Sequence, residues 1–270
     1  MIANGFLRRC VSGVPFFSCI ALEKLAGLRH GFSTREGGAD SPQGNSLNLS
    51  LVPWDTPQRV AENRRRLLEA LGLAHARLVT LSQVHSDVVH IIVESDGQRN
   101  RRREGDALVT QQAGVALGVL LADCFPILLA DPESGAVAAV HSGWRGAGQR
   151  ILSKTIQAMC KSFGSDPGRL TAAIGPGIRG CCFEVGLEVM DLFGERYPGE
   201  KLGNPLDGRP GKFFLDLPRA LEIQLQDSGV GKHRIFDIGL CTRCSPGEFF
   251  SYRAEGQRSG RMMAVISRIH

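Results

Sequence analysis

Residues 118–146 read GVLLADCFPILLADPESGAVAAVHSGWRG, in which a turn separates two apolar runs of the kind that form buried strands. The first run contains Asp123 followed by Cys124, and the second ends at His141, just before a glycine-containing turn with Arg145. A hydrophobic core needs no thiol, carboxylate or imidazole at the ends of its strands. We therefore predict that this stretch forms two central strands and contains the active site.

Length and composition indicate one domain. The 270 residues contain no recognisable linker, repeat or low-complexity segment, so we expect a single domain over residues 1–270. The formal charge of +5 favours small anionic ligands but falls well short of a nucleic-acid-binding signature. Eight scattered cysteines without a convincing secretory signal are typical of the reduced thiols of a cytoplasmic protein.

Two apolar segments are better explained by strands than by membrane insertion. The N-terminal run around Pro15 follows a basic flank, but the proline and the lack of a small-residue cleavage pattern make it a poor signal peptide. Residues 113–130 contain Asp123 and Pro126 and therefore fit two consecutive buried strands rather than a membrane span. We expect no membrane partner.

The rest of the chain alternates strands with a few amphipathic helices. One helix is expected to begin at Thr56-Pro57, a capping hydroxyl followed by a proline, and to end at Gly72. Residues 35–50 are expected to form a long loop, and the arginine-rich run 99–103 is interpreted as a solvated loop. Further helices are expected at residues 146–163, 187–196 and 218–228, and strands at residues 28–34, 78–82, 88–93, 107–110, 170–174, 235–240, 249–252 and 262–266.

Three interpretations fit His85, Cys124 and His141 from the residues alone. They could be the three protein ligands of a catalytic zinc site with an open fourth position. Cys124 could instead be a nucleophile with either histidine as its base, or all three residues could be structural. Spacing does not separate these interpretations, because the residues fall in no short metal-binding motif.

The other cysteines offer a weaker metal motif. Cys241 and Cys244 form one C-x-x-C, and a structural zinc site would need a second pair. Cys181 and Cys182 are adjacent, which is not the usual spacing of metal ligands. We interpret these four residues as plain buried cysteines.

Many separate blocks of the chain resemble one family. In order along residues 28–268 they are HGFSTREGG, SLNLS, LSQVHSD, GDALVT, LADCFPILLAD, AVHSGWRG, AAIGPGIRGCCFEVG, FFSYRAEG and GRM. In these blocks the chain resembles the YfiH-like proteins, also called laccase-domain proteins, multicopper polyphenol oxidases or peptidoglycan editing factors. The laccase name does not fit the chemistry of this chain, because multicopper oxidases need several His-x-His pairs and the seven histidines form none.

The resemblance implies a fold, a metal and a substrate. It implies an α+β domain whose β-sandwich core has helices on both sides, in four layers, similar to the catalytic domain of cytotoxic necrotizing factors. It implies a Zn²⁺ ion bound by His85, Cys124 and His141. It also implies phosphorolysis of adenosine, inosine, guanosine and methylthioadenosine, and hydrolytic deamination of adenosine.

Residue types within the matching blocks give candidate substrate contacts. We expect phosphate to bind to Arg35, to Arg145 and to the start of the helix after residue 146, where backbone N–H groups are free. We expect Asn48 and Gln83 to bind the ribose or the base.

The proton-transfer residue of known zinc nucleobase deaminases has no direct counterpart in this chain. Those enzymes have a glutamate in an H-x-E motif, whereas this chain has His85-Ser86-Asp87. We therefore expect Asp123 or Asp87 to transfer protons.

Two other functions stay open. The resemblance also implies peptidoglycan editing, in which the Cys–His arrangement would hydrolyse a wrongly charged muramoyl amino acid precursor. A non-enzymatic zinc-binding module that docks a partner is the third hypothesis. The expected oligomeric state is a monomer or a weak homodimer.

Overall fold

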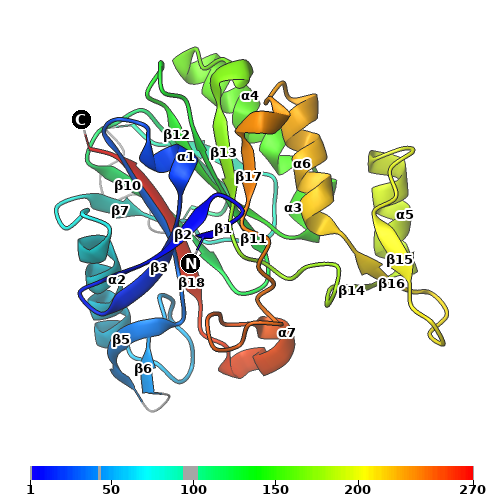
Figure 1. Cartoon of the computed structure of the whole chain (residues 1–270), viewed down its shortest axis with the longest axis horizontal. Coiled ribbons are helices and arrows are strands. Elements are labelled where there is room, and N and C mark those ends of the chain that lie inside the picture. The colour runs from blue at the N-terminus through cyan, green and yellow to red at the C-terminus, as the bar shows by residue number, and fades with distance from the viewer. Residues whose placement is uncertain (1, 42–43, 94–102, 270) are drawn as a thin grey trace.

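Two packed sheets form the centre of the molecule in the computed structural model, which describes residues 2–41, 44–93 and 103–269 (Figure 1). The seven-stranded sheet has the order β1 (Ile2–Ala3), β2 (Phe6–Val11), β3 (Val14–Cys19), β4 (Leu28–Ser33), β18 (Met262–Arg268), β10 (Val115–Leu121) and β7 (Arg77–Val79). The six-stranded sheet has the order β17 (Ile235–Asp237), β13 (Thr171–Ile174), β11 (Phe125–Ala130), β12 (Val137–Ser142), β9 (Ala107–Thr110) and β8 (Val89–Ile91).

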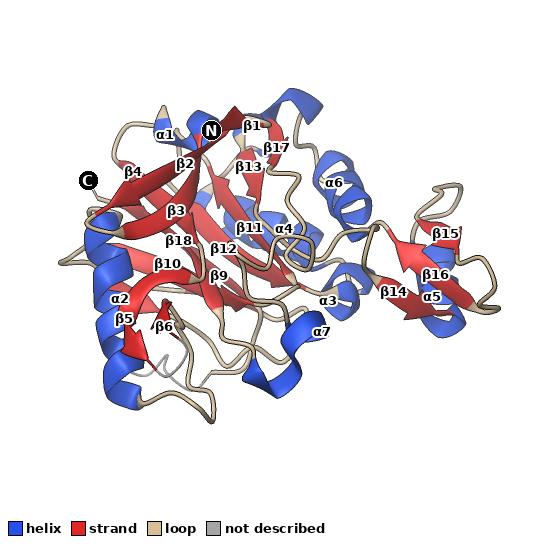
Figure 2. Ribbon diagram, turned by 60° about the horizontal axis from the view of Figure 1, so that its bottom comes forward, coloured by secondary structure: helices blue, strands red, loops and turns tan. Residues whose placement is uncertain are grey.

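Smaller elements surround these sheets. A three-stranded sheet of β14 (Glu184–Gly186), β16 (Lys212–Leu215) and β15 (Gly203–Pro205) projects at one end together with α5 (Leu187–Arg196) (Figure 2). Strands β5 (Glu36–Ser41) and β6 (Gly44–Ser46) form a hairpin. The remaining helices are α1 (Ile20–Glu23), α2 (Pro57–Ala70), α3 (Trp144–Gly148), α4 (Ile151–Phe163), α6 (Leu217–Asp227) and α7 (Tyr252–Glu255), with 3-10 turns at Pro167–Arg169, Lys232–Arg234 and Gly256–Arg258.

The core is divided into three clusters that define four layers. One apolar cluster fills the space between the two sheets. A second packs the outer face of the six-stranded sheet against α3, α4 and α6, and a third packs the seven-stranded sheet against α2. This arrangement confirms the predicted α+β fold with a sandwich core and helices on both sides.

Strand alternation places the predicted site residues on one face. Along β12, Val137 and Ala139 face the cluster between the sheets, while Ala138 and Val140 face the helices. His141 is the next residue in the series 137, 139, 141, so its side chain also faces the opposite sheet. The same alternation along β11 and β9 brings Cys124 and Asp106 to that face as well, so all three side chains lie on the side of the six-stranded sheet that faces the other sheet.

The crossing from one sheet to the other also positions Cys124. The expected pair of consecutive strands is present, but β10 pairs with β18 and β7, whereas β11 pairs with β12 and β13. The chain changes sheets between Leu121 and Phe125, and Asp123 has the positive φ of 89° that this sharp turn requires. Cys124 therefore lies at the boundary of both sheets.

Several sequence expectations need correction. The helix expected over residues 146–163 is broken, because Arg150 has a left-handed backbone with φ of 59° between α3 and α4. The loop expected over residues 35–50 contains the β5–β6 hairpin, and residues 249–252 form no strand because Ser251 caps α7 by accepting from the Ala254 N–H. Of the arginine-rich run, residues 99–102 lie outside the described part of the chain.

The remaining secondary-structure expectations agree with the structure to within a few residues. Thr56 caps α2 by accepting from the Arg59 N–H at 3.3 Å, and Gly72 follows the helix with φ of 70°. Among the described residues no helix is both long and apolar enough to cross a bilayer.

A buried histidine makes stability depend on pH. His30 on β4 accepts a hydrogen bond at Nε2 from the Cys19 N–H at 2.8 Å, and burial lowers its pKa from 6.5 to about 4. Unfolding returns the pKa to its ordinary value, so stability is complete above pH 6.5 and is lost as the pH falls toward 4. At low pH the free energy of unfolding is lower by about 3 kcal/mol because of this histidine. Urea unfolding of the wild type and of His30→Gln measures it.

The difference between the two unfolding free energies isolates this effect from other titrating groups. We expect the wild type to lose stability relative to His30→Gln between pH 6.5 and 4, because the amide oxygen can still accept from Cys19 but does not titrate. A difference that stays constant over this range would show that His30 is not the source.

Candidate metal centre

His85, Cys124 and His141 come together beside the ends of the central strands β11 and β12. Their ligand atoms all lie within 4.8 Å of one another. Cys124 directly precedes β11, His141 belongs to β12 and His85 follows β7. The two imidazole rings lie 5.1 Å apart between centroids and are nearly perpendicular, at 74°. The three residues singled out from the sequence therefore form one cluster.

One buried carboxylate organises both histidines. Asp106, at the start of β9, accepts from Nδ1 of His141 at 2.8 Å, which leaves Nε2 of that ring available as a ligand. The same carboxylate accepts from the backbone N–H of His85 at 3.1 Å and from the N–H and Oγ of Ser86 at 2.6 and 2.7 Å. These bonds hold His85 at its positive φ of 59°, a conformation that non-glycine residues rarely adopt.

The Cys124 thiol ionises more readily than an ordinary cysteine. Burial raises its pKa, but the nearby His141 and His85 lower it more strongly, to about 6. Burial likewise lowers the pKa of His141, while Cys124 and Asp106 raise it to about 9. Burial raises the pKa of Asp106, but its hydrogen bonds from His141 and Ser86 bring it down to about 2. At neutral pH Cys124 is therefore available as a thiolate, the form that binds metals.

The sulfur of Cys124 needs a glycine beside it. A Cβ atom on Gly143 would lie 2.9 Å from Cys124 Sγ and 3.3 Å from Cδ2 of His85. We expect Gly143→Ala to displace both ligands and to weaken metal binding by about tenfold or more, the cost usually seen when the support of a ligand is disturbed. Competition with a chromogenic chelator measures the affinity.

A glycine elsewhere provides the matched control. Gly194 in α5 has no atom within 4 Å of a Cβ built on it, so Gly194→Ala should leave metal affinity unchanged. Equal affinities for Gly143→Ala and the wild type would show that the packing of Gly143 against the thiol does not matter for the site.

The cluster lies in an open cavity of about 840 Å³. This volume is within the range of small-molecule sites. The cavity wall includes three aromatic side chains, Trp144, Phe183 and Tyr252. Flat aromatic faces of this kind stack on the rings of bases.

Three arginines also line the cavity. The guanidinium of Arg145 lies 4.3 Å from the Trp144 ring and has no carboxylate partner among the described residues. Arg253 lies over the ring of Phe183, and Arg261 donates to the carbonyl oxygens of Ser259 and Gly260. Their charge favours an anionic ligand.

The other predicted substrate residues have different positions. Gln83 lines the cavity, but its amide is engaged with Leu120, donating to its carbonyl at 2.8 Å and accepting from its N–H at 2.7 Å. Asn48 is fully buried, lies outside the cavity wall and accepts from the Arg261 N–H at 2.9 Å. Arg35 lines a different cavity and forms an ion pair with Glu255 at 2.6 Å.

The two candidate proton-transfer residues are also separated. Asp123 lines the cavity, and its carboxylate accepts from Oγ1 of Thr242 and from the N–H of Arg253, both at 2.7 Å. Asp87 lies outside the cavity wall and forms an ion pair with Lys154 on α4.

Sequence reasoning missed several residues of this site. Asp106, Arg253 and Arg261 were not among the residues predicted to form the site. Each lies within a block that carried the family resemblance, GDALVT, FFSYRAEG or GRM. The only indication in the sequence was that a polar residue stood inside a matching block. Its spacing from the predicted metal ligands gave no further information.

The donor set fits a zinc ion. One thiolate and two imidazoles are a usual set of three protein ligands for a catalytic zinc, which keeps a further position for water or substrate. The hydrogen bond between Asp106 and His141 matches the carboxylate–histidine support that zinc ligands commonly have. The structure thus contains a His/Cys/His metal-binding group.

A four-layer α+β fold with a His/Cys/His metal-binding group beside the ends of its central strands defines the class of this protein. The chain belongs to the family described as multi-copper polyphenol oxidoreductase laccase, whose sequence pattern matches residues 29–269. It is 43% identical over 239 residues to a purine nucleoside phosphorylase of Deinococcus radiodurans, covering 88% of each chain.

Two further proteins extend this similarity. Adenosine deaminase RL5, from an unknown prokaryotic organism, is 36% identical over 263 residues, which cover 92% of this chain and 99% of that protein. The crystal structure of YlmD from Geobacillus stearothermophilus superimposes with a TM-score of 0.89 at 33% identity, covering 99% of this chain and 100% of YlmD.

Proposed function

We propose that this protein is a zinc-dependent purine nucleoside phosphorylase that also deaminates adenosine by hydrolysis. The observation behind this proposal is a single cavity that combines the His85–Cys124–His141 group with aromatic walls and arginines. The names of the relatives from Deinococcus radiodurans and of RL5 support the two activities.

The walls of the cavity provide separate places for base and phosphate. Trp144, Phe183 and Tyr252 would stack on the purine. Arg145, which lacks a carboxylate partner in the described part of the chain, would bind phosphate with help from Arg253 or Arg261. In this proposal Arg35 and Asn48 do not contact the substrate, because neither lines this cavity. Asn48 accepts from the backbone N–H of Arg261 and so helps to position that arginine.

The chemistry requires a held phosphate, a polarised leaving group and a proton. In phosphorolysis a phosphate oxygen bonds to C1′ of the ribose while the bond from C1′ to the purine nitrogen breaks, and the base leaves with a proton. Zinc bound by the trio would supply a Lewis acid and activate water for deamination. Asp106 keeps the His141 ring oriented, and Asp123 is the candidate for proton transfer because it borders Cys124 in the cavity.

Product analysis tests the proposal. Purified zinc-loaded protein incubated with adenosine and phosphate should form adenine with ribose 1-phosphate, and inosine without phosphate, as seen by mass spectrometry. Absence of all three products would exclude both activities. An Asp123→Asn variant with bound zinc and full deaminase turnover would exclude Asp123 from proton transfer.

The phosphate site makes its own prediction. We expect Arg145→Ala to raise the KM for phosphate by about tenfold to a hundredfold, because a hydrogen bond to a charged group is worth about 1.5–3 kcal/mol. Steady-state kinetics at varied phosphate measures the change. Arg258, an exposed arginine outside the cavity wall, is the matched control, and an unchanged KM in Arg145→Ala would place phosphate elsewhere.

The lowered pKa of Cys124 also supports a second candidate, a Cys–His hydrolase for muramoyl amino acid precursors. The two candidates differ in the state of the thiol. In a zinc enzyme, iodoacetamide should alkylate Cys124 only after chelation, whereas a thiol hydrolase would be alkylated and inactivated in the metal-loaded state. Turnover of a muramoyl substrate without turnover of adenosine would favour the hydrolase.

We propose further that the chain acts as one domain over residues 1–270, as a monomer or a weak homodimer, in the cytoplasm. The eight cysteines, all free, support a reducing compartment. Light scattering over a range of protein concentrations tests the oligomeric state.

A further inference from the structure

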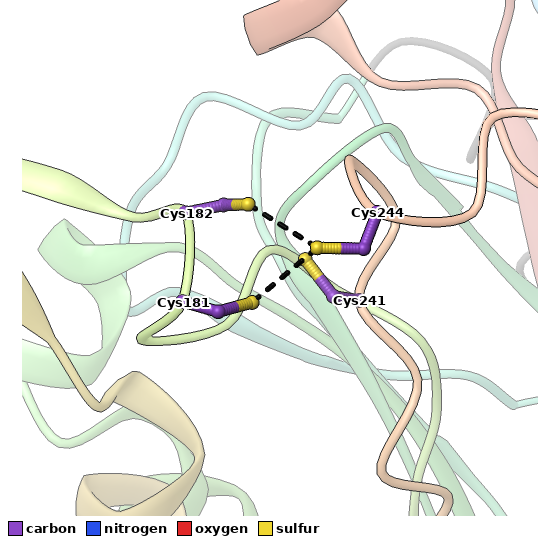
Figure 3. A group of neighbouring side chains, drawn as sticks. All are labelled: Cys181, Cys182, Cys241 and Cys244. Carbon is purple, nitrogen blue, oxygen red and sulfur yellow. Dashed lines mark hydrogen bonds between the residues drawn. The ribbon is translucent and has the colours of Figure 1, made fainter.

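Four cysteines outside the metal centre gather in one place. The Sγ atoms of Cys181, Cys182, Cys241 and Cys244 all lie within 4.8 Å of one another (Figure 3). The sulfur of Cys244 is 3.5 Å from that of Cys181 and 3.4 Å from that of Cys182. All four are free, and Cys181 and Cys244 are exposed. Their interpretation as plain buried cysteines is therefore wrong for these two.

The fold explains why a C-x-x-C and an adjacent pair meet. Cys241 forms an isolated β-bridge with Gly177, which ties the loop after β17 to the loop after β13. The second loop then turns tightly, with the Cys182 N–H donating to the Arg179 carbonyl at 2.8 Å. Both side chains of the adjacent pair, Cys181 and Cys182, point toward the C-x-x-C (Figure 3). They are the second pair that the sequence pattern lacked.

We propose that these four cysteines bind a structural Zn²⁺ ion. Four thiolates are a usual ligand set of closed, tetrahedral zinc sites. With Zn–S bonds of about 2.3 Å, the sulfurs of such a site lie about 3.8 Å apart. Two of the Sγ–Sγ distances are 3.4 and 3.5 Å, and the others are at most 4.8 Å, so the observed range includes the value expected for a zinc site. A disulfide would need about 2.05 Å.

Backbone N–H groups surround one sulfur of the cluster. Those of Arg179, Cys244 and Arg243 are directed at Cys241, and such groups partly offset the negative charge that four thiolates bring to one ion. The side chain of Arg179 is held in place by Asp237, at N–O distances of 2.6 and 2.8 Å.

A metal at this place would join two walls of the large cavity. Phe183 lines the cavity and directly follows Cys182. Thr242 lies inside the C-x-x-C and donates through Oγ1 to Asp123, the neighbour of Cys124. The four-cysteine site would therefore fix the distance between the Phe183 wall and Asp123, while none of its own ligands belongs to the His85–Cys124–His141 group.

Metal counting and X-ray absorption test the proposal. Protein purified with a reductant and without chelator should contain two zinc equivalents per chain by mass spectrometry of the metals. A Cys181→Ser/Cys244→Ser double variant and a Cys124→Ser variant should each contain one equivalent. A Cys10→Ser/Cys160→Ser variant, which changes two cysteines outside both clusters, should keep two.

The zinc that remains in Cys124→Ser identifies the site even if the double variant fails to fold. Its absorption spectrum should show four sulfur neighbours at about 2.3 Å and no nitrogen. Cys124→Ser protein without zinc, a shell containing nitrogen, or iron in place of zinc would overturn the proposal. So would fewer than eight titratable thiols in denatured, metal-free protein prepared without reductant, because that result would indicate a disulfide.

This inference is independent of the proposed function. A protein that processes no nucleoside but has a four-sulfur zinc shell would refute the proposed function alone. An active phosphorylase whose Cys124→Ser variant contains no zinc would refute the four-cysteine site alone.

Discussion

Cys124→Ser is expected to lose the metal of the His85–Cys124–His141 group and to lower turnover by about a thousandfold or more. A serine hydroxyl is not ionised at neutral pH, whereas the pKa of the Cys124 thiol is lowered to about 6. Removing a Lewis acid costs several kcal/mol of transition-state stabilisation, and about 4 kcal/mol corresponds to a thousandfold in rate. Metal content and kcat/KM for adenosine with phosphate measure the two effects.

A cysteine outside the cavity separates this effect from general damage. Cys160 on α4 is a free, partly exposed cysteine, so Cys160→Ser should keep both metal and turnover. Chelation of the wild type should abolish turnover, and added zinc should restore it, while Cys124→Ser should not recover. Full turnover of metal-free protein would contradict a metal-dependent reaction at this cavity.

Asp106→Asn is expected to have the second largest effect. The carboxylate accepts from Nδ1 of His141, from the backbone of His85 and from Ser86. An amide of the same size can accept through one atom only, so a buried donor is left opposite its NH₂ group. We expect the affinity for zinc and the turnover to fall by about 10-fold to 100-fold, with a loss of about 1–3 kcal/mol in stability.

A variant of another buried carboxylate separates the loss of zinc affinity from the loss of stability. Asp131, at the far end of β11, accepts from the backbone N–H groups of Glu133 at 3.0 Å and Asp166 at 3.3 Å. Asp131→Asn should lower the unfolding free energy by a similar amount but leave metal affinity unchanged. If both variants lost stability and neither lost zinc affinity, Asp106 would be a structural residue only.

Local sequence patterns predicted much of the secondary structure. Apolar runs with strand-like composition predicted β9, β10, β11 and β12, and the Thr56-Pro57 start and Gly72 stop located α2, because composition and capping depend on neighbouring residues. The break between α3 and α4 was not predicted, because no neighbouring residue indicates that the backbone of Arg150 is left-handed. Likewise, residues 113–130 were correctly predicted to form two consecutive strands, but nothing in this run shows that β10 and β11 belong to different sheets.

The two arginines predicted to bind phosphate show what the sequence alone does not decide. Arg35 and Arg145 looked equivalent in the sequence, as basic residues within matching blocks. The structure pairs Arg35 with Glu255 on a separate cavity and leaves Arg145 in the large cavity beside the metal-binding group. Only the packing of distant segments decides which positive charge is available to an anion.

The sequence by itself determined the chemistry that is available, namely a thiol and two imidazoles at the ends of strands. The tertiary structure decided that Asp106 supports two of these residues and that Cys181 and Cys182 meet the C-x-x-C. The physical reason is that strand pairing and chain crossings set distances between residues far apart in the chain. A one-residue shift in the register of β12, for example, would turn His141 to the opposite face of its sheet.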